Sequence, residues 1–210
     1  MDTAGRMLDI AERLAQTRGF NGFSYSDIAA ELGIAKASLH HHFATKAELG
    51  RALMQRYTEG FEAALAGIDG ADEDAFAKLG RYVRLYEEVL RNDRLCLCGM
   101  LAAEYSTLPK EMRAQVRLFF EKNEMWLAAL IERGRREKVL RSGAPARDVA
   151  RMIVSSLEGA MLLARSCEDP GRFASSVRPI LAELKAKRVR KKKPARLNRI
   201  GWIGRIGSPP

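Results

Sequence analysis

Residues 24–49 read SYSDIAAELGIAKASLHHHFATKAEL, and this stretch decides the fold. Ala29, Gly33 and Leu39 follow one another in it at intervals of four and six residues. Two helices that cross steeply over a short turn need a small side chain where their backbones touch, a turn residue that tolerates positive φ, and an apolar anchor on the second helix. The spacing therefore predicts a helix-turn-helix, with helices over residues 25–32 and 36–42.

Two capping signals frame this motif. Ser24 and Asp27 stand three residues apart at the start of the first helix, and Thr45 and Glu48 repeat the pattern after the second. The second signal predicts another helix, whose free N-terminal N–H groups, together with Lys46, are placed to hold a phosphate. Because the second helix of a helix-turn-helix lies in the major groove, the motif indicates DNA binding.

The rest of the chain also has a helical pattern. Apolar residues recur every three or four positions, and the alternation typical of strands is absent. Beyond the motif we expect one helix that ends before Gly19 and further helices over about 46–66, 72–90, 100–106, 109–138, 146–167 and 171–187. The sequence therefore predicts an all-α fold of about nine helices.

The run from Ile28 to Leu49 resembles the DNA-binding domain of the TetR family of transcriptional regulators. The resemblance is specific over about residues 6–50, and the helical remainder has the length and helix order of such regulators. It implies a helix-turn-helix DNA-binding domain over residues 1–50 and a ligand-binding and dimerisation domain over 51–187. Residues 188–210 are a basic tail with too little apolar content to fold alone, and we expect it to be disordered. The resemblance also implies a homodimeric repressor that binds a pseudo-palindromic operator in double-stranded DNA and is released by a small-molecule effector or by cysteine modification.

The same resemblance assigns the DNA contacts. They are Ser26, Lys36, Ala37, Ser38, His40, His41 and Lys46. Ala37 is expected to touch a thymine methyl, Lys36 and Ser38 to bond bases or phosphates, and Lys46 to anchor a phosphate. His40 stands where the family commonly has tyrosine, so its contact with the backbone is shorter.

The three consecutive histidines, His40 to His42, invite a metal-site interpretation. Successive helical residues point about 100° apart, so they cannot converge on one ion from a single helix. We expect one histidine to pack and the others to face DNA, and we expect neither a resident metal nor a cofactor.

Cys96 and Cys98 allow two interpretations. They are either small apolar core residues or reactive thiols, since Arg91, Arg94 and the free amides of a following helix would lower a thiol pKa. A disulfide between them would close a strained ring. The segment from Cys96 to Glu104 also resembles a TetR branch that responds to electrophiles or small unsaturated compounds, which implies that one of the thiols senses such a compound.

An effector pocket is expected among the central helices, for a small hydrophobic or amphipathic molecule. Its candidate residues are Tyr82, Tyr86, Cys96, Cys98, Tyr105, Phe119, Met125 and Trp126. The last two helices carry apolar faces, and Ser155, Ser156 and Gly159 allow close helix approach. The resemblance implies that this pair forms the dimer interface, whereas the residues alone also allow an intramolecular pair.

The charge distribution bears on rival functions. The chain has a net charge of +10, but residues from Lys185 onward contribute ten basic and no acidic side chains, so the remainder is neutral. Residues 1–50 carry five basic and six acidic side chains, so specific binding must depend on a few placed donors. A rival function is non-specific nucleic-acid binding through the tail. A thiol-dependent enzyme is disfavoured, because no histidine lies outside 40–42.

The compartment follows from three features. The N-terminal residues show no secretory signal, and no apolar run approaches the roughly 18 residues that span a bilayer. Three cysteines, an odd number, argue against a disulfide scaffold. We therefore expect a cytoplasmic protein without a membrane partner.

Overall fold

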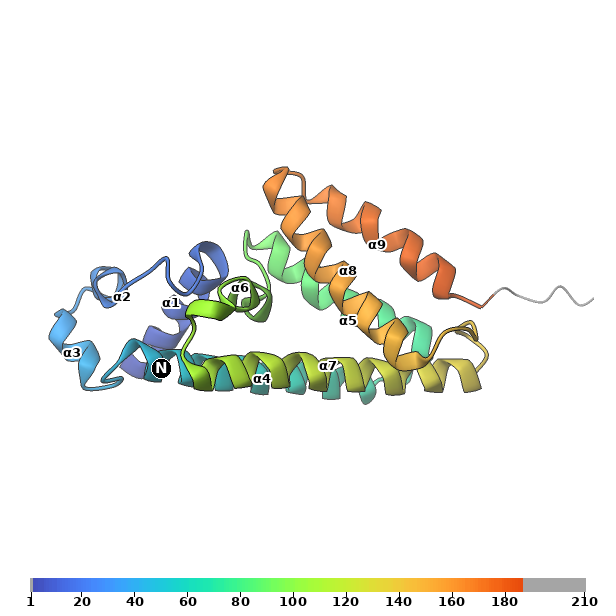
Figure 1. Ribbon diagram of the computed structural model, residues 1–210, viewed down its shortest axis with the longest axis horizontal. Coiled ribbons are helices and arrows are strands. Elements are labelled where there is room, and N and C mark those ends of the chain that lie inside the picture. Colours follow the sequence, from blue (N-terminus) through green and yellow to red (C-terminus); the bar gives the residue numbers. More distant parts are fainter. Residues whose placement is uncertain (1, 187–210) are drawn as a thin grey trace, which may run out of the picture.

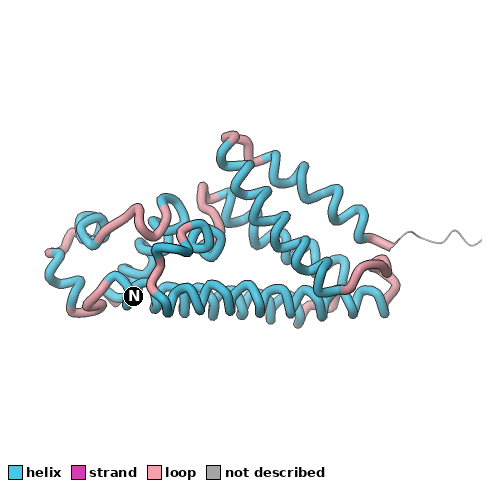
Figure 2. Tube along the Cα trace, viewed as in Figure 1, coloured by secondary structure: helices cyan, strands magenta, loops and turns pink. Residues whose placement is uncertain are grey.

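The computed structural model describes residues 2–186 and is built from helices (Figures 1 and 2). Within this range, nine α-helices and one 3₁₀ turn follow in the order α1 (Thr3–Arg18), α2 (Tyr25–Leu32), α3 (Lys36–His40), α4 (Lys46–Asp69), α5 (Ala75–Arg91), α6 (Leu97–Ala103), η1 (Tyr105–Thr107), α7 (Lys110–Arg136), α8 (Ala146–Ser166) and α9 (Gly171–Leu184). The predicted all-α fold and helix number are confirmed. The tail expected at residues 188–210 lies outside the described residues.

The three N-terminal helices form close to their predicted positions, and α2 begins at its predicted capping signal. Asp2 caps α1 through a 2.8 Å hydrogen bond from the Gly5 N–H. At the start of α2, the Asp27 carboxylate accepts hydrogen bonds from both the N–H and the hydroxyl of Ser24, at 2.8 and 2.7 Å. These bonds satisfy donors that a helix start leaves free, and they hold the pKa of Asp27 below its ordinary value.

The turn between α2 and α3 has the geometry that its glycine predicted. Gly33 adopts the left-handed conformation with φ 69° and ψ 32°, and its N–H bonds to the Ala29 carbonyl. An added Cβ would meet nothing within 4 Å, so only the backbone conformation requires glycine here. Leu39 on α3 is completely buried and anchors α3 to the rest of the N-terminal domain.

The remaining helices form a longer body, shown in Figure 1. Helices α4 and α7 lie side by side along its length, and α8 packs on both α7 and α9. Helix α5 contacts α4, α7 and α8, which places it at the centre of the body. The short helix α6 contacts both α1 and α7, so it lies between the N-terminal helices and the rest. Among the described residues, no helix is both long and apolar enough to cross a membrane.

Several boundaries differ from the prediction. Helix α3 ends at His40 instead of residue 42, α5 begins at Ala75 instead of residue 72, and α9 ends at Leu184 instead of residue 187. Helix α4 continues through Gly67 to Asp69, because an isolated glycine with ordinary helical φ weakens a helix without ending it. The helix expected over 100–106 begins earlier, at Leu97, and is followed by the separate turn η1. Burial of Leu97, Cys98 and Leu101 on one face explains the earlier start.

Candidate nucleic-acid interface and ligand cavity

The surface of α3 is divided between an anchor and exposed polar residues. Leu39 faces inward, whereas Lys36, Ala37 and Ser38 are exposed, as are His41 on the same side of the motif and Ser26 on α2. This arrangement leaves donors and a methyl group free for base edges and phosphates, the groups that a major groove offers.

The three histidines differ in what they contact. All three are exposed. The His40 ring nevertheless lies 4.8 Å from the Tyr25 ring, and its Nδ1 is 3.0 Å from the Ala44 carbonyl oxygen. Within residues 2–186, no group of three or more histidine, cysteine or acidic side chains has the geometry to hold a metal ion.

A hollow of about 310 Å³ lies beside the exposed face of α3. It is lined by Phe23, Ser24, Tyr25, Lys36, His40 and Lys46. Nζ of Lys46 donates hydrogen bonds to the carbonyls of Phe20 and Phe23 and lies 4.7 and 4.3 Å from the centres of their rings. Burial lowers the pKa of Lys46. Lys46 lies in this concave surface beside Lys36, at the N-terminus of α4, and this arrangement suits the binding of an anion.

The N-terminal helices are joined to the longer body by polar contacts at the end of α1. Arg165 of α8 donates to the carbonyls of Gln16 and Thr17 at 3.2 and 2.8 Å. The Leu95 N–H donates to the same Gln16 carbonyl at 3.2 Å. Arg56 of α4 pairs with Asp9 and Glu12 of α1. Groups from α4, α8 and the α5–α6 connection therefore hold α1 directly.

A cavity of about 400 Å³ opens at this junction. Its apolar wall consists of Tyr57, Gly60, Phe61, Ala64, Leu85, Tyr86, Val89, Cys96 and Met161. Its polar wall consists of Glu12, Gln16, Arg56, Glu88, Asn92 and Arg94. The volume lies within the range of small-molecule sites, and the mixture of apolar surface with a few polar groups is typical of them.

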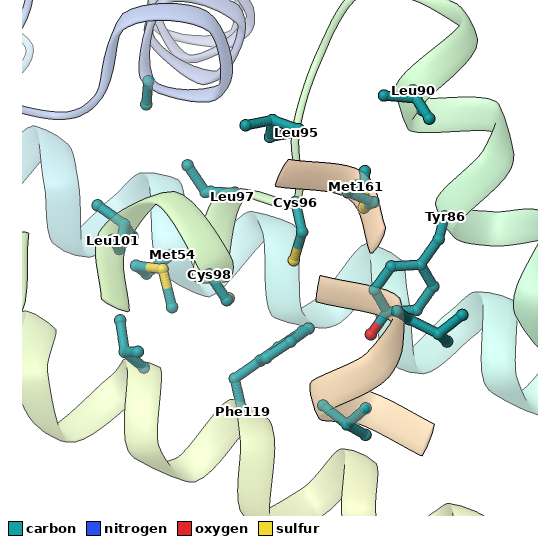
Figure 3. Packing of buried hydrophobic residues seen from close by; sticks show 14 of the residues in the cluster. Met54, Tyr86, Leu90, Leu95, Cys96, Leu97, Cys98, Leu101, Phe119 and Met161 are labelled. Carbon is teal, nitrogen blue, oxygen red and sulfur yellow. The ribbon is translucent and has the colours of Figure 1, made fainter. Parts of the chain in front are cut away.

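Cys96 lies at the inner side of this cavity and caps α6. Figure 3 shows its side chain turned toward the interior, where Tyr86 and Phe119 also point. Hydrogen bonds from Cys98, Glu158, the Gly99 N–H and Tyr57 lower the pKa of the Cys96 thiol to about 6, against the opposing effect of burial. The Tyr57 hydroxyl donates to Sγ over 3.8 Å.

The pKa values of two neighbours of Cys96 are shifted in the opposite direction. Burial, together with the hydrogen bond to Cys96, raises the pKa of Cys98. Burial and the proximity of Cys96 raise the pKa of Glu158 on α8. Its Oε1 is buried without a hydrogen-bond partner among the described residues. The thiol of Cys96 is thus the more acidic of the two cysteines. The raised pKa of Glu158 favours its protonated form, which can donate a hydrogen bond to the Cys96 sulfur.

Only some of the residues predicted for the effector pocket line the cavity. Tyr86 and Cys96 line the cavity, while Tyr82, Cys98 and Phe119 are buried nearby. Tyr82, Tyr86 and Asn123 form a closed set of buried hydrogen bonds of 2.9–3.2 Å. Trp126 stacks on Tyr82 but donates outward to Asp69. Tyr105 and Met125 are 42% and 56% exposed and lie outside the cavity lining.

Several cavity residues were not anticipated from the sequence. Gln16, Arg56, Tyr57 and Phe61 line it, and Glu158 approaches Cys96 from α8. Helical periodicity places Tyr57 and Phe61 on one face of α4, four residues apart, so an aromatic pair at that spacing was a usable signal. Nothing in the sequence indicates that α1 reaches this cavity.

Comparisons with known proteins agree with this geometry. The family model described as "Bacterial regulatory proteins, tetR family" matches residues 7–53, and "Tetracyclin repressor-like, C-terminal domain" matches residues 75–180. The chain belongs to the TetR family. The first match covers the helix-turn-helix, and the second covers α5 and α8, two of the four helices that line the cavity.

Individual TetR proteins are similar over most of their length. The solved structure of a TetR-family regulator from Agrobacterium tumefaciens is 34% identical and superposes with a TM-score of 0.84, covering 87% of this chain and 97% of that one. The HTH-type transcriptional regulator CymR of Pseudomonas putida is 28% identical over 82% of this chain and 84% of its own length. The HTH-type transcriptional repressor NemR of Escherichia coli is 24% identical over 86% and 94%. This TetR protein is a ligand-responsive DNA-binding transcriptional regulator.

Proposed function

We propose that this TetR protein is a homodimeric repressor that binds a pseudo-palindromic operator and is released when a small molecule occupies the cavity. The observation that carries the DNA-binding part is the α2–Gly33–α3 turn, with Leu39 buried and Lys36, Ala37 and Ser38 exposed beside it. One such helix reads few base pairs, so a dimer that spans two half-sites supplies the specificity. We assign DNA binding to residues 1–50 and effector binding and dimerisation to residues 51–187.

The proposed contacts divide into two classes. Ala37, with Lys36 and Ser38 on either side, reads base edges in the major groove. Ser26, His40, His41 and Lys46 hold phosphates, and of these His40 and Lys46 line the hollow beside α3. Such contacts position the DNA backbone and carry no sequence information. Replacing Ser38 with Ala should therefore change base preference, whereas replacing His41 with Ala should weaken binding similarly across sequences.

The dimer interface we propose is the outer face of α8 with α9. Met152 and Leu163 on α8 are 46% and 56% exposed and lie on one side of the helix. Gly159 lies between them, and a Cβ added to it would meet nothing within 4 Å, so this side of α8 is uncovered by its own chain. A small residue flanked by exposed apolar ones suits close packing against the same helix of a second copy.

The interface is tested with a matched pair of charged substitutions. Leu163→Glu should convert the protein to a monomer and lower operator affinity by at least tenfold. Met125→Glu, which changes an equally exposed residue on α7, should leave the dimer intact. Sedimentation velocity and operator titration report the two properties. A dimeric Leu163→Glu protein with unchanged affinity would exclude this interface.

The effector release we propose has two routes. A small molecule binds in the cavity, or Cys96 is modified there. Cys96 is favoured over Cys98 because it lines the cavity and its thiol pKa is lowered, whereas that of Cys98 is raised. Either event releases DNA if it favours a conformation whose recognition helices no longer match successive grooves. We propose no catalytic activity and a cytoplasmic location.

The remaining alternative is non-specific binding through the basic C-terminal segment. Its support is the excess of basic residues from Lys185 onward. Deletion of residues 187–210 separates the two functions. A regulator that reads its operator through α3 keeps its preference for that sequence over random DNA. A tail-driven binder loses nearly all affinity and shows no such preference.

A further inference from the structure

Gln16 on α1 is buried in an unusual way. Its side chain is 2% exposed, it lines the cavity, and its Oε1 has no hydrogen-bond partner among residues 2–186. Nearly all buried polar groups in folded proteins are hydrogen-bonded, so an unpaired amide in a cavity wall calls for a partner that the chain itself does not supply. A ligand in the cavity is such a partner.

The backbone of the same residue ties α1 to the effector-binding helices. The Gln16 carbonyl accepts hydrogen bonds of 3.2 Å from both the Leu95 N–H and Arg165 of α8. Leu95 directly precedes Cys96, which lines the same cavity. Gln16 is therefore part of a DNA-binding helix, and its side chain also forms part of the cavity wall.

The charges around the cavity define the ligand class. Glu12 pairs with Arg56 at 2.9 Å, so their opposite charges neutralise each other. Glu88 and Arg94 supply one further charge of each sign. With no net charge on the wall and aromatic rings along α4, the cavity suits a neutral, largely apolar molecule.

We propose that Gln16 determines effector specificity: its side-chain carbonyl accepts a hydrogen bond from a hydroxyl or amide N–H of a small, neutral, largely apolar effector. This inference rests on the proposed function, in which the cavity is the effector site. The bound molecule then contacts α1 itself, so ligand binding acts on the DNA-binding helices without an intermediate element. Because the bond depends on where α1 lies, the ligand has different affinities for different positions of α1.

The test is a double-mutant cycle with a defined probe pair, 2-phenylethanol and its methyl ether, which lacks the O–H donor. Calorimetric titration measures the affinity of each probe for the wild type and for Gln16→Met, an apolar replacement of similar size. The hydroxyl should improve wild-type binding about tenfold over the ether. In Gln16→Met this advantage should disappear, while the ether binds as before. Gln55→Met, a change of an exposed glutamine on α4, should behave as wild type.

Two further readouts keep the outcome interpretable. Gln16→Met removes an unsatisfied amide, so its unfolding temperature should not fall, and a folding defect cannot imitate the result. Ala64→Phe places a ring in the cavity and should abolish binding of both probes.

Four results would count against the inference, and they separate it from the proposed function. Equal binding of the two probes to the wild type, or a hydroxyl advantage that survives in Gln16→Met, overturns the role of Gln16 and leaves the cavity as the effector site. Binding that Ala64→Phe does not affect places the ligand elsewhere and overturns both. Absence of binding by either probe at millimolar concentration overturns the assigned ligand class.

Discussion

The carboxylate of Glu104 accepts a hydrogen bond of 2.6 Å from the backbone N–H of Phe20, across 84 positions of sequence. The Asn21 N–H donates to the same carboxylate at 3.2 Å. Glu104 directly follows α6, and Cys96 directly precedes it, so this one short helix joins the cavity to the loop after α1. The far end of α6 is therefore bonded directly to the backbone of the loop that links α1 to α2.

Glu104→Ala should weaken this connection. It leaves two backbone donors without their charged acceptor, so the free energy of unfolding should fall by about 1–3 kcal/mol in urea denaturation. Glu121→Ala, a change of an exposed glutamate on α7, should stay within about 0.5 kcal/mol of the wild type. Equal stability of the two variants would show that solvent replaces the carboxylate without cost.

A pair of glycine substitutions tests the turn of the motif. Gly33 and Gly67 both have free space around an added Cβ, but only Gly33 has positive φ. Gly33→Ala should therefore destabilise the protein by about 1–2 kcal/mol through backbone strain alone. Gly67→Ala lies inside α4 and should stabilise it by about 0.5–1 kcal/mol. Thermal unfolding measures both, and changes of the same sign would contradict the argument.

These two glycines also show what sequence reasoning can and cannot predict. At Gly33 several local signals agree, since a capping box precedes the helix and an apolar anchor follows the turn. The run from Gly67 to Gly70 predicted a helix end, but α4 continues to Asp69 because Leu65 and Ile68 pack into the core. Local chemistry predicted the elements wherever two signals coincided.

The cavity was harder to predict for a different reason. Periodicity identifies the buried face of one helix, but it does not say which distant helices meet there. Tyr86 was anticipated as an aromatic residue of the central helices, and Cys96 as a candidate reactive thiol. Gln16 was not, because it lies on a DNA-binding helix and reaches the cavity through the packing of α1 against α4 and α6. Met125 has the right residue type but faces solvent.

Lys46→Met separates two roles of one lysine. Nζ of Lys46 bonds to the carbonyls of Phe20 and Phe23, so its loss should lower the free energy of unfolding by about 1–3 kcal/mol. If Lys46 also holds a phosphate, the slope of operator affinity against salt concentration should fall by about one on a log–log plot. Lys122→Met, on α7, should change neither the slope nor the sequence preference. A destabilised Lys46→Met protein with the wild-type slope would restrict Lys46 to supporting the loop.

Cys96 should react as a thiolate at neutral pH. Its thiol pKa is lowered to about 6, so the thiolate predominates above that pH and is lost below it. In a Cys167→Ser background, the rate of iodoacetamide alkylation at Cys96 should change little between pH 7 and 8.5 and should fall about tenfold per unit below pH 6. After denaturation in urea, the same cysteine should follow an ordinary thiol, with a midpoint of about 8.5. Fragment-ion mass spectrometry distinguishes Cys96 from Cys98.

Glu158 decides how this low pKa is maintained. If its carboxyl group is protonated and donates to the thiolate, as its raised pKa indicates, Glu158→Leu should move the alkylation midpoint upward, because a donor is lost. Glu158→Gln keeps an N–H donor and should leave the midpoint near that of the wild type. A downward shift in Glu158→Leu would show instead that the carboxylate is ionised and opposes the thiolate. In that case Cys98 and the Gly99 N–H stabilise the negative charge on Cys96 without help from α8.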